Sequence, residues 1–103
     1  ALYTEEGQLL PVYSPAIISR AAIQAFWQGC IDMGIGALRR HPSEVDQLNE
    51  TVNEVGAYEL YGRDGKLLDV GKYIVIWKWA QGRWQIYRDI WTSNLPPAPR
   101  KEK

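Results

Sequence analysis

Asp89 is the residue of this sequence best placed to do chemistry, because it stands between Tyr87 and Trp91 in a run rich in aromatic side chains. Residues two apart on a β-strand point to the same side of a sheet, so these three side chains are expected to share one face. A carboxylate among aromatic rings is poorly solvated, which raises its pKa toward the range where a general base works near neutral pH. Asp89 is therefore predicted to be a general acid or base.

A structural role for Asp89 competes with this catalytic one. The carboxylate could instead form an ion pair with one of three arginines and so satisfy a charge in the core: Arg20, Arg83 or Arg88. Structural ion pairs also shift pKa values, so an altered pKa does not separate the two roles. The sequence leaves both open.

The other titratable residues are predicted to be structural. His41 has no His, Cys or carboxylate at ligand spacing, so an exposed side chain is expected and no metal site. Cys30 has no basic neighbour that would stabilise a thiolate, so a buried thiol is expected. Glu59 is expected to form a salt bridge at the rim of an interface. A solvated acidic face, rather than a pair of catalytic carboxylates, is expected from Glu44, Asp46, Glu50 and Glu54.

One helix is expected near the start of the chain. It is predicted to begin at Ser19, whose hydroxyl can accept from the first-turn N–H groups, and to end at Gly34 and Gly36. Its apolar residues follow the spacing of a single helix face: Ile23, Phe26, Trp27, Cys30 and Ile31. This face is expected to pack on a sheet.

The rest of the chain is predicted to be strand. Strands are expected over residues 37–48, 51–61, 67–79 and 83–93, with a further short strand before the helix over residues 8–12. Pro42 cannot donate to a neighbouring strand, so its strand is expected at a sheet edge or a bulge. Tight turns at Arg63-Asp64-Gly65 and Ala80-Gln81-Gly82 predict an antiparallel meander.

Composition narrows the class of protein. The length of 103 residues predicts one domain, over residues 1–95. The 12 Lys plus Arg are balanced by 12 Asp plus Glu, so no nucleic-acid partner is expected. No apolar run is long enough for a membrane span, and no signal peptide is recognised, so no membrane partner is expected. A single cysteine indicates a reducing, cytoplasmic location. Residues 96–103 are expected to form a disordered, Pro- and Lys-rich tail.

The last strand is apolar on both of its faces. Strict alternation places Trp84, Ile86 and Ile90 on one face, opposite the face of Asp89. A sheet covered on one side only would expose a large apolar patch, which monomers rarely tolerate. The sheet is therefore expected to be covered by its own helices around a cavity on one side and by a second subunit on the other.

Four segments carry a resemblance to a known family: YTEEGQLLP, AAIQAFWQ, DGKLLDVGKYIVIWKW and GRWQIYRDIWTSN. In order and spacing, residues 2–94 resemble the SnoaL-like proteins of the nuclear transport factor 2-like, cystatin-like superfamily. The resemblance implies an α+β fold, in which a curved antiparallel sheet wraps around helices as a cone with an internal pocket. It also implies a homodimer formed through the sheet. It does not specify a reaction, since members include isomerases, cyclases, hydrolases and non-catalytic association domains.

Two departures from the family pattern are visible. Relatives usually open with a long amphipathic helix, whereas this sequence starts almost at its first strand; either that N-terminal helix lies outside this numbering or the fold is shorter and lacks a wall. The residues of ketosteroid isomerases are also absent. Leu10 or Pro11 stands where their base would be, and Val75 stands where their hydrogen-bonding acid would be. Apolar side chains can neither take a proton nor stabilise an enolate, which argues against that activity.

Alternation and the family register together predict an aromatic cavity that contains the carboxylate of Asp89. Its expected lining residues are Trp27, Tyr58, Tyr73, Val75, Trp77, Tyr87 and Trp91. The predicted function is binding of a small, largely apolar or aromatic molecule, without a metal or organic cofactor. If the chain is an enzyme, Asp89 would move a proton in an isomerase, cyclase or hydrolase reaction, with Tyr58 and Tyr87 orienting a carbonyl or hydroxyl. The alternative is a non-catalytic binding or dimerisation module.

Overall fold

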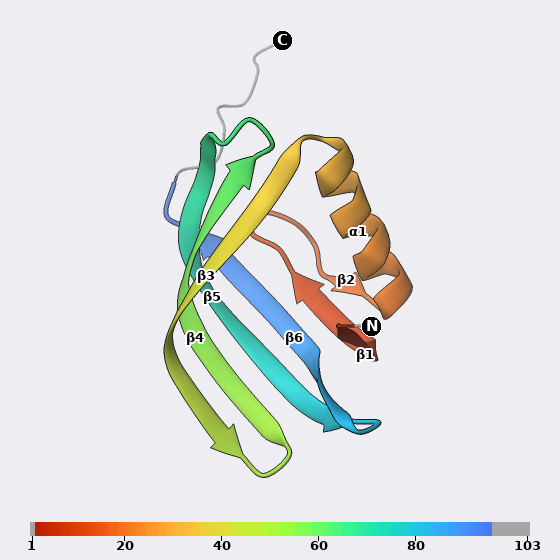
Figure 1. Cartoon of the computed structure of the whole chain (residues 1–103). Helices are drawn as coiled ribbons and strands as arrows, with labels where there is room; N and C mark the ends of the chain where they lie inside the picture. The colour runs from red at the N-terminus through yellow and green to blue at the C-terminus, as the bar shows by residue number, and fades with distance from the viewer. Residues whose placement is uncertain (1, 96–103) are drawn as a thin grey trace.

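A curved six-stranded sheet carries one helix against its concave face in the computed structural model, which describes residues 2–95 (Figure 1). The elements in chain order are β1 (Tyr3–Leu10), β2 (Ile17–Ile18), α1 (Arg20–Asp32), β3 (Ile35–Leu48), β4 (Thr51–Gly62), β5 (Leu67–Ala80) and β6 (Arg83–Ser93). The expected α+β architecture is confirmed. The predicted tail, residues 96–103, lies outside the described residues.

The strands follow the order β2-β1-β6-β5-β4-β3 in the sheet. Strands β3 to β6 form the expected antiparallel meander, and the turn residues Gly65 and Gly82 have φ angles of 84° and 77°. β1 was expected over residues 8–12 but begins at Tyr3, and it lies parallel to β6. One edge of β6 is already paired with β5, and β1 fills the other edge. Pro11, which has no N–H to donate, follows the last residue of β1.

β3 forms one edge of the sheet, and its register with β4 shifts between Pro42 and Glu44. Both features agree with the expected placement of Pro42 at an edge or a bulge.

The helix α1 is 13 residues long. Within residues 2–95, no helix combines the length and apolarity that crossing a membrane requires.

The helix α1 begins where the sequence predicts. The Oγ atom of Ser19 accepts a hydrogen bond from the N–H of Ala22 at 3.4 Å, and Gly34, with φ 109°, follows the last turn. Ile23 is fully buried against the sheet. Gly36 lies inside β3 instead of ending the helix, and a Cβ atom there would come within 2.8 Å of the backbone of Arg63. This glycine therefore allows a close backbone contact.

Two tyrosines lie over glycines on the concave face. Tyr58 of β4 is opposite Gly71 of β5, and Tyr73 of β5 is opposite Gly56 of β4. A Cβ atom at Gly71 would lie 2.6 Å from Cε2 of Tyr58, and one at Gly56 would lie 2.8 Å from the hydroxyl of Tyr73. Each ring thus fills the space that a side chain on the neighbouring strand would occupy.

A bulge in β6 changes which residues face the helix. Ile76 is opposite Arg88 but Trp77 is opposite Ile86, so Tyr87 is the extra residue. Ile86 is consequently buried in the core, and its predicted place on the outer face is wrong. Tyr87 lies instead against two cations: the Lys78 Nζ and Arg88 Cζ atoms are 4.1 and 3.7 Å from its ring centroid. Strict alternation fails here because a bulge adds one residue to the count.

Candidate functional site

A hollow lies between α1 and the concave face of the sheet. It encloses about 80 Å³ and continues into an open groove of about 290 Å³ along α1 and β3. Five side chains border both spaces: Trp27, Ile35, Leu38, Arg40 and Leu60. The hollow is also lined by Phe26, Cys30, Tyr58, Asp69, Tyr73, Asp89 and Trp91. Its wall is therefore largely apolar and aromatic, with three charged groups.

Three aromatic rings form the part of this wall nearest the helix. Trp27 and Trp91 are stacked, with ring centroids 5.7 Å apart and an interplanar angle of 30°. Phe26 meets Trp27 edge-on, with centroids 5.2 Å apart. Stacked and edge-to-face contacts are the favourable arrangements of aromatic pairs. The rings therefore hold one another in place around an apolar surface.

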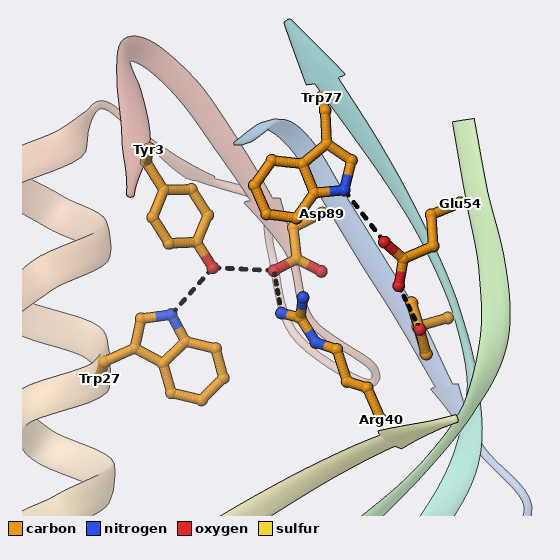
Figure 2. Close-up of polar contacts among 7 residues, drawn as sticks. Tyr3, Trp27, Arg40, Glu54, Trp77 and Asp89 are labelled. Atoms are coloured by element: carbon orange, nitrogen blue, oxygen red, sulfur yellow. Dashed lines mark hydrogen bonds and ion pairs between the residues drawn. The ribbon is translucent and has the colours of Figure 1, made fainter. Parts of the chain in front are cut away.

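The carboxylate of Asp89 is buried in this wall, with 3% of the residue exposed. Figure 2 shows a chain of donors that ends on it: Nε1 of Trp27 donates to the hydroxyl of Tyr3 at 3.2 Å, and that hydroxyl donates to Oδ2 of Asp89 at 2.8 Å. Burial raises the pKa of Asp89, although the Tyr3 hydrogen bond and the charge of Arg40 act in the opposite direction. Burial and the Asp89 carboxylate also raise the pKa of Tyr3, which therefore stays a donor at neutral pH.

The two carboxylate oxygens of Asp89 have different surroundings. Both Tyr3 and Arg40, whose Nη2 is 3.9 Å away, approach Oδ2. Within residues 2–95, no hydrogen bond is made to Oδ1, and the one fully buried side-chain polar atom without a partner is Oγ1 of Thr4. Oδ1 is therefore not fully buried. Asp89 lines the hollow, and its Oδ1 is an acceptor that no described residue uses.

The cation beside Asp89 is Arg40 and none of the three arginines proposed from the sequence. Its side chain is 27% exposed, and Cζ lies 5.5 Å from the ring centroid of Tyr73. The Nε of Arg20 donates to the backbone oxygen of Tyr3 at 2.9 Å, and Arg88 donates to the backbone oxygen of Glu6. Arg40 reaches the concave face because the β3–β4 register places it opposite Tyr58.

Glu54 is a second carboxylate of this region, and its predicted place on a solvated acidic face is wrong. Its Oε2 accepts from the hydroxyl of Tyr73 at 2.5 Å, and its Oε1 accepts from Nε1 of Trp77 at 3.1 Å (Figure 2). Glu54 is opposite Val75, which is opposite Asp89, so both carboxylates lie on one face with a single strand between them. The available signal was that Glu54 is two residues from Gly56 and four from Tyr58, which face inward.

Asp69 is the third carboxylate of the concave face, and it was not predicted. Its Oδ2 accepts from the hydroxyl of Tyr58 at 2.8 Å, while its Oδ1 accepts from Oγ of Ser93 and from the N–H of Val70. Burial and the hydrogen bond to Asp69 raise the pKa of Tyr58. Because both oxygens of Asp69 already accept hydrogen bonds, it is less suited than Asp89 to act as a base.

Of the residues predicted to line a cavity, the structure brings together five around the hollow: Trp27, Tyr58, Tyr73, Asp89 and Trp91. Val75 is buried in the core, and Trp77 is bonded to Glu54; neither lines the hollow. The predicted inward direction of Tyr87 is wrong because of the bulge. Tyr3 and Arg40 are the partners of Asp89 that the sequence did not reveal.

The remaining titratable candidates lie outside the hollow or, in the case of Cys30, line it as a thiol that is not activated as a thiolate. Nε2 of His41 lies 3.0 Å from Oε1 of Glu59 on the surface, and this hydrogen bond lowers the pKa of Glu59. Burial raises the pKa of Cys30, which lines the hollow as a thiol. Within residues 2–95, no three His, Cys, Asp or Glu side chains are grouped so that they could hold a metal ion.

Solved structures with the same arrangement of elements are known. A domain of unknown function with a cystatin-like fold from Nostoc punctiforme has a TM-score of 0.77 and 16% identity, over 92% of this chain and 62% of that one. A ketosteroid isomerase-like protein from Erwinia carotovora atroseptica has a TM-score of 0.75 and 19% identity, over 92% and 78% of the two chains. A nuclear transport factor 2-like protein with a cystatin-like fold from Novosphingobium aromaticivorans has a TM-score of 0.76 and 18% identity, over 94% and 68%.

These similarities concern architecture. This chain spans 62% of the length of the Nostoc domain, so that domain contains segments without a counterpart here. No family model and no curated protein sequence matches the chain. At such identities the shared property is the fold, because unrelated functions occur on the same fold. The chain has the nuclear transport factor 2-like, cystatin-like α+β fold that its sequence resembles.

Proposed function

We propose that the chain binds a small, largely apolar molecule in the hollow and groove beneath α1, and that Asp89 exchanges a proton with it. The observation that carries this proposal is the Oδ1 atom of Asp89. This atom accepts no hydrogen bond within residues 2–95, and it belongs to a residue that is only 3% exposed and lines an aromatic hollow. A ligand that carries a hydrogen-bond donor can use this acceptor and can transfer its proton to it.

The size of the space favours a small ligand. Typical ligand pockets measure about 300 to 1,000 Å³. The hollow alone is smaller than this, but the groove that continues from it adds about 290 Å³. A ligand would therefore place one end in the hollow beside Asp89 and extend along Leu38 and Leu60 toward the groove.

The surroundings of Asp89 fit a general acid or base. Burial raises its pKa, so its carboxylate is more basic than a solvated one and more readily protonated near neutral pH. The Tyr3 hydrogen bond holds Oδ2 and leaves Oδ1 to accept the proton. The stacked rings of Trp27 and Trp91 line the same hollow, so Asp89 borders an apolar surface there. Isomerase, cyclase and hydrolase chemistry would all use such a group.

Binding is tested by filling the hollow. Wild-type protein is expected to bind 2-naphthol with a stoichiometry of one in isothermal titration calorimetry, because its rings fit the aromatic wall and its hydroxyl can donate to Asp89. Cys30→Phe places a ring in the hollow and should weaken binding at least about tenfold, or about 1.4 kcal/mol. Ala25→Phe adds the same ring to an exposed position of α1 and should change nothing. Equal affinity in Cys30→Phe, or no binding to wild-type protein, would refute the proposal.

A second candidate function, dimerisation, is favoured by the outer face of the sheet. Val55, Ile74 and Ile90 are opposite one another across β4, β5 and β6, and their exposures are 37%, 45% and 43%. They point away from α1, because their neighbours in sequence face it. Contiguous exposed apolar side chains mark interaction surfaces. We propose that a second copy of this chain covers this row.

Sedimentation velocity at micromolar concentration tests the dimer. Wild-type protein is expected to sediment as a dimer, and Ile74→Lys as a monomer, because a buried lysine at the centre of the row would lose its hydration. Leu48→Lys is the matched control, since Leu48 is 68% exposed at the end of β3 and outside the row. A monomeric wild-type protein, or a dimeric Ile74→Lys variant, would exclude this interface.

A further inference from the structure

We infer that the hollow selects a neutral head group with one hydrogen-bond donor beside one acceptor, such as a carboxamide or a lactam, and that Arg40 determines this specificity. The inference rests on the proposed function, since it requires a ligand in the hollow. It assigns the donor of the ligand to Oδ1 of Asp89 and the acceptor to the guanidinium of Arg40.

The first argument is the distance between the two charged groups. Nη2 of Arg40 lies 3.9 Å from Oδ2 of Asp89, beyond the usual limit of about 3.2 Å for a hydrogen bond. The two groups attract each other by charge without being bonded, and both border the hollow. A third polar group can bridge polar groups that are too far apart for a direct hydrogen bond. An adjacent donor and acceptor on a ligand can bridge the two residues by donating to Oδ1 of Asp89 and accepting from the guanidinium of Arg40.

The second argument is which donors remain available at the hollow. The hydroxyls of the three buried tyrosines already donate to carboxylates: Tyr3 to Asp89, Tyr58 to Asp69 and Tyr73 to Glu54. Arg40 carries five N–H donors and stays charged at any physiological pH. Within residues 2–95, none of these donors makes a hydrogen bond. Arg40 is thus the charged donor that a ligand acceptor can use.

The third argument is charge. An anionic head group would meet Arg40 but also the carboxylates of Asp69 and Asp89, so the wall of the hollow carries more negative than positive charge. A cationic head group that reached Asp89 would lie beside the guanidinium of Arg40. Like charges at close range oppose binding in a poorly solvated site. A neutral head group avoids both repulsions.

Five naphthalene derivatives of similar shape test the inference by calorimetry. 2-Naphthamide offers a donor and an acceptor, 2-acetylnaphthalene an acceptor only, 2-naphthoate an anion, 2-naphthylmethylammonium a cation, and naphthalene no polar group. Wild-type protein is expected to bind 2-naphthamide at least tenfold more tightly than the other four. Arg40→Met, which keeps the apolar part of the side chain, should remove this preference, so that 2-naphthamide binds no more tightly than 2-acetylnaphthalene or naphthalene.

Two further variants separate specificity from folding. Arg39→Met removes a neighbouring exposed arginine and should keep the full preference for 2-naphthamide. Arg40→Lys keeps the charge beside Asp89 but loses the planar fork of donors, and should retain part of the preference while melting as wild type does. Equal binding of all five probes, or tightest binding of 2-naphthoate, would overturn the inference while the proposed binding function stands. Binding of none would overturn both.

Discussion

Gly71→Ala is expected to destabilise the protein by about 3 kcal/mol, at the upper end of the usual cost of overpacking. The added Cβ atom would overlap the backbone oxygen of Thr92 and lie 2.6 Å from Cε2 of Tyr58. Gly71 belongs to β5, which is paired on both sides, and it lies opposite Tyr58 of β4 and Ser93 of β6, so neither neighbouring strand can move away without breaking the sheet. Displacing Tyr58 would also break its hydrogen bond to Asp69.

Urea unfolding followed by tryptophan fluorescence measures this loss. Gly29→Ala is the matched control, because a Cβ atom at Gly29 would meet nothing within 4 Å. Gly29 lies inside α1, where alanine is favoured over glycine by about 1 kcal/mol, so this variant should be slightly more stable than wild type. Similar stability changes in both variants would show that the close approach at Gly71 does not limit the fold.

Asp89→Asn is expected to slow the base-catalysed opening of 5-nitrobenzisoxazole at least about a hundredfold, the usual contribution of a general base. In this reaction a base removes one C–H proton, the N–O bond breaks, and a cyanophenolate forms whose absorbance is followed. The substrate is a small apolar bicycle that suits the aromatic wall of the hollow. The asparagine amide cannot take the proton. A wild-type rate equal to that of the variant would exclude Asp89 as a base.

The same variant tests the pH dependence of stability. Burial raises the pKa of Asp89 in the folded chain above its unfolded value of about 3.9. The folded state therefore holds this proton to higher pH, and the stability that Asp89 contributes is present below pH 3.9 and lost as the pH rises through the folded pKa. The free energy of unfolding of wild type, relative to Asp89→Asn, should fall through this window. A rise would contradict the raised pKa.

Local chemistry made much of the fold predictable. A helix start, a helix face and a tight turn each depend on residues close together in sequence: the Ser19 cap, the spacing of Ile23, Phe26 and Trp27, and the turn glycines. Helix α1 and strands β3 to β6 accordingly lie where the sequence predicts them. β1 and the bulge at Tyr87 were not predictable in this way. Both depend on which strand pairs with which, and that is decided by residues far apart in the chain.

In the candidate site too, the sequence predicts what depends on neighbouring residues and misses contacts between distant ones. Alternation predicts a shared face for Asp89 and Trp91, and the family register predicts that this face is the inner one. Both residues line the hollow. Their partners were missed because each comes from another strand: Tyr3 is 86 residues from Asp89 in sequence, and Arg40 belongs to the edge strand β3. The sequence groups Glu54 with Glu44, Asp46 and Glu50 as one solvated acidic face, whereas its own contacts lie across the sheet on β5.

The pairing of β1 with β6 affects how the protein folds during its synthesis. β1 precedes the other elements described, whereas its partner strand β6, which carries Asp89, follows all of them. Contacts of such long sequence separation form slowly, because a large loop must close before they are gained. On the ribosome, β1 therefore lacks this partner strand until β6 has left the exit tunnel, and the hollow gains Asp89 and Trp91 only then.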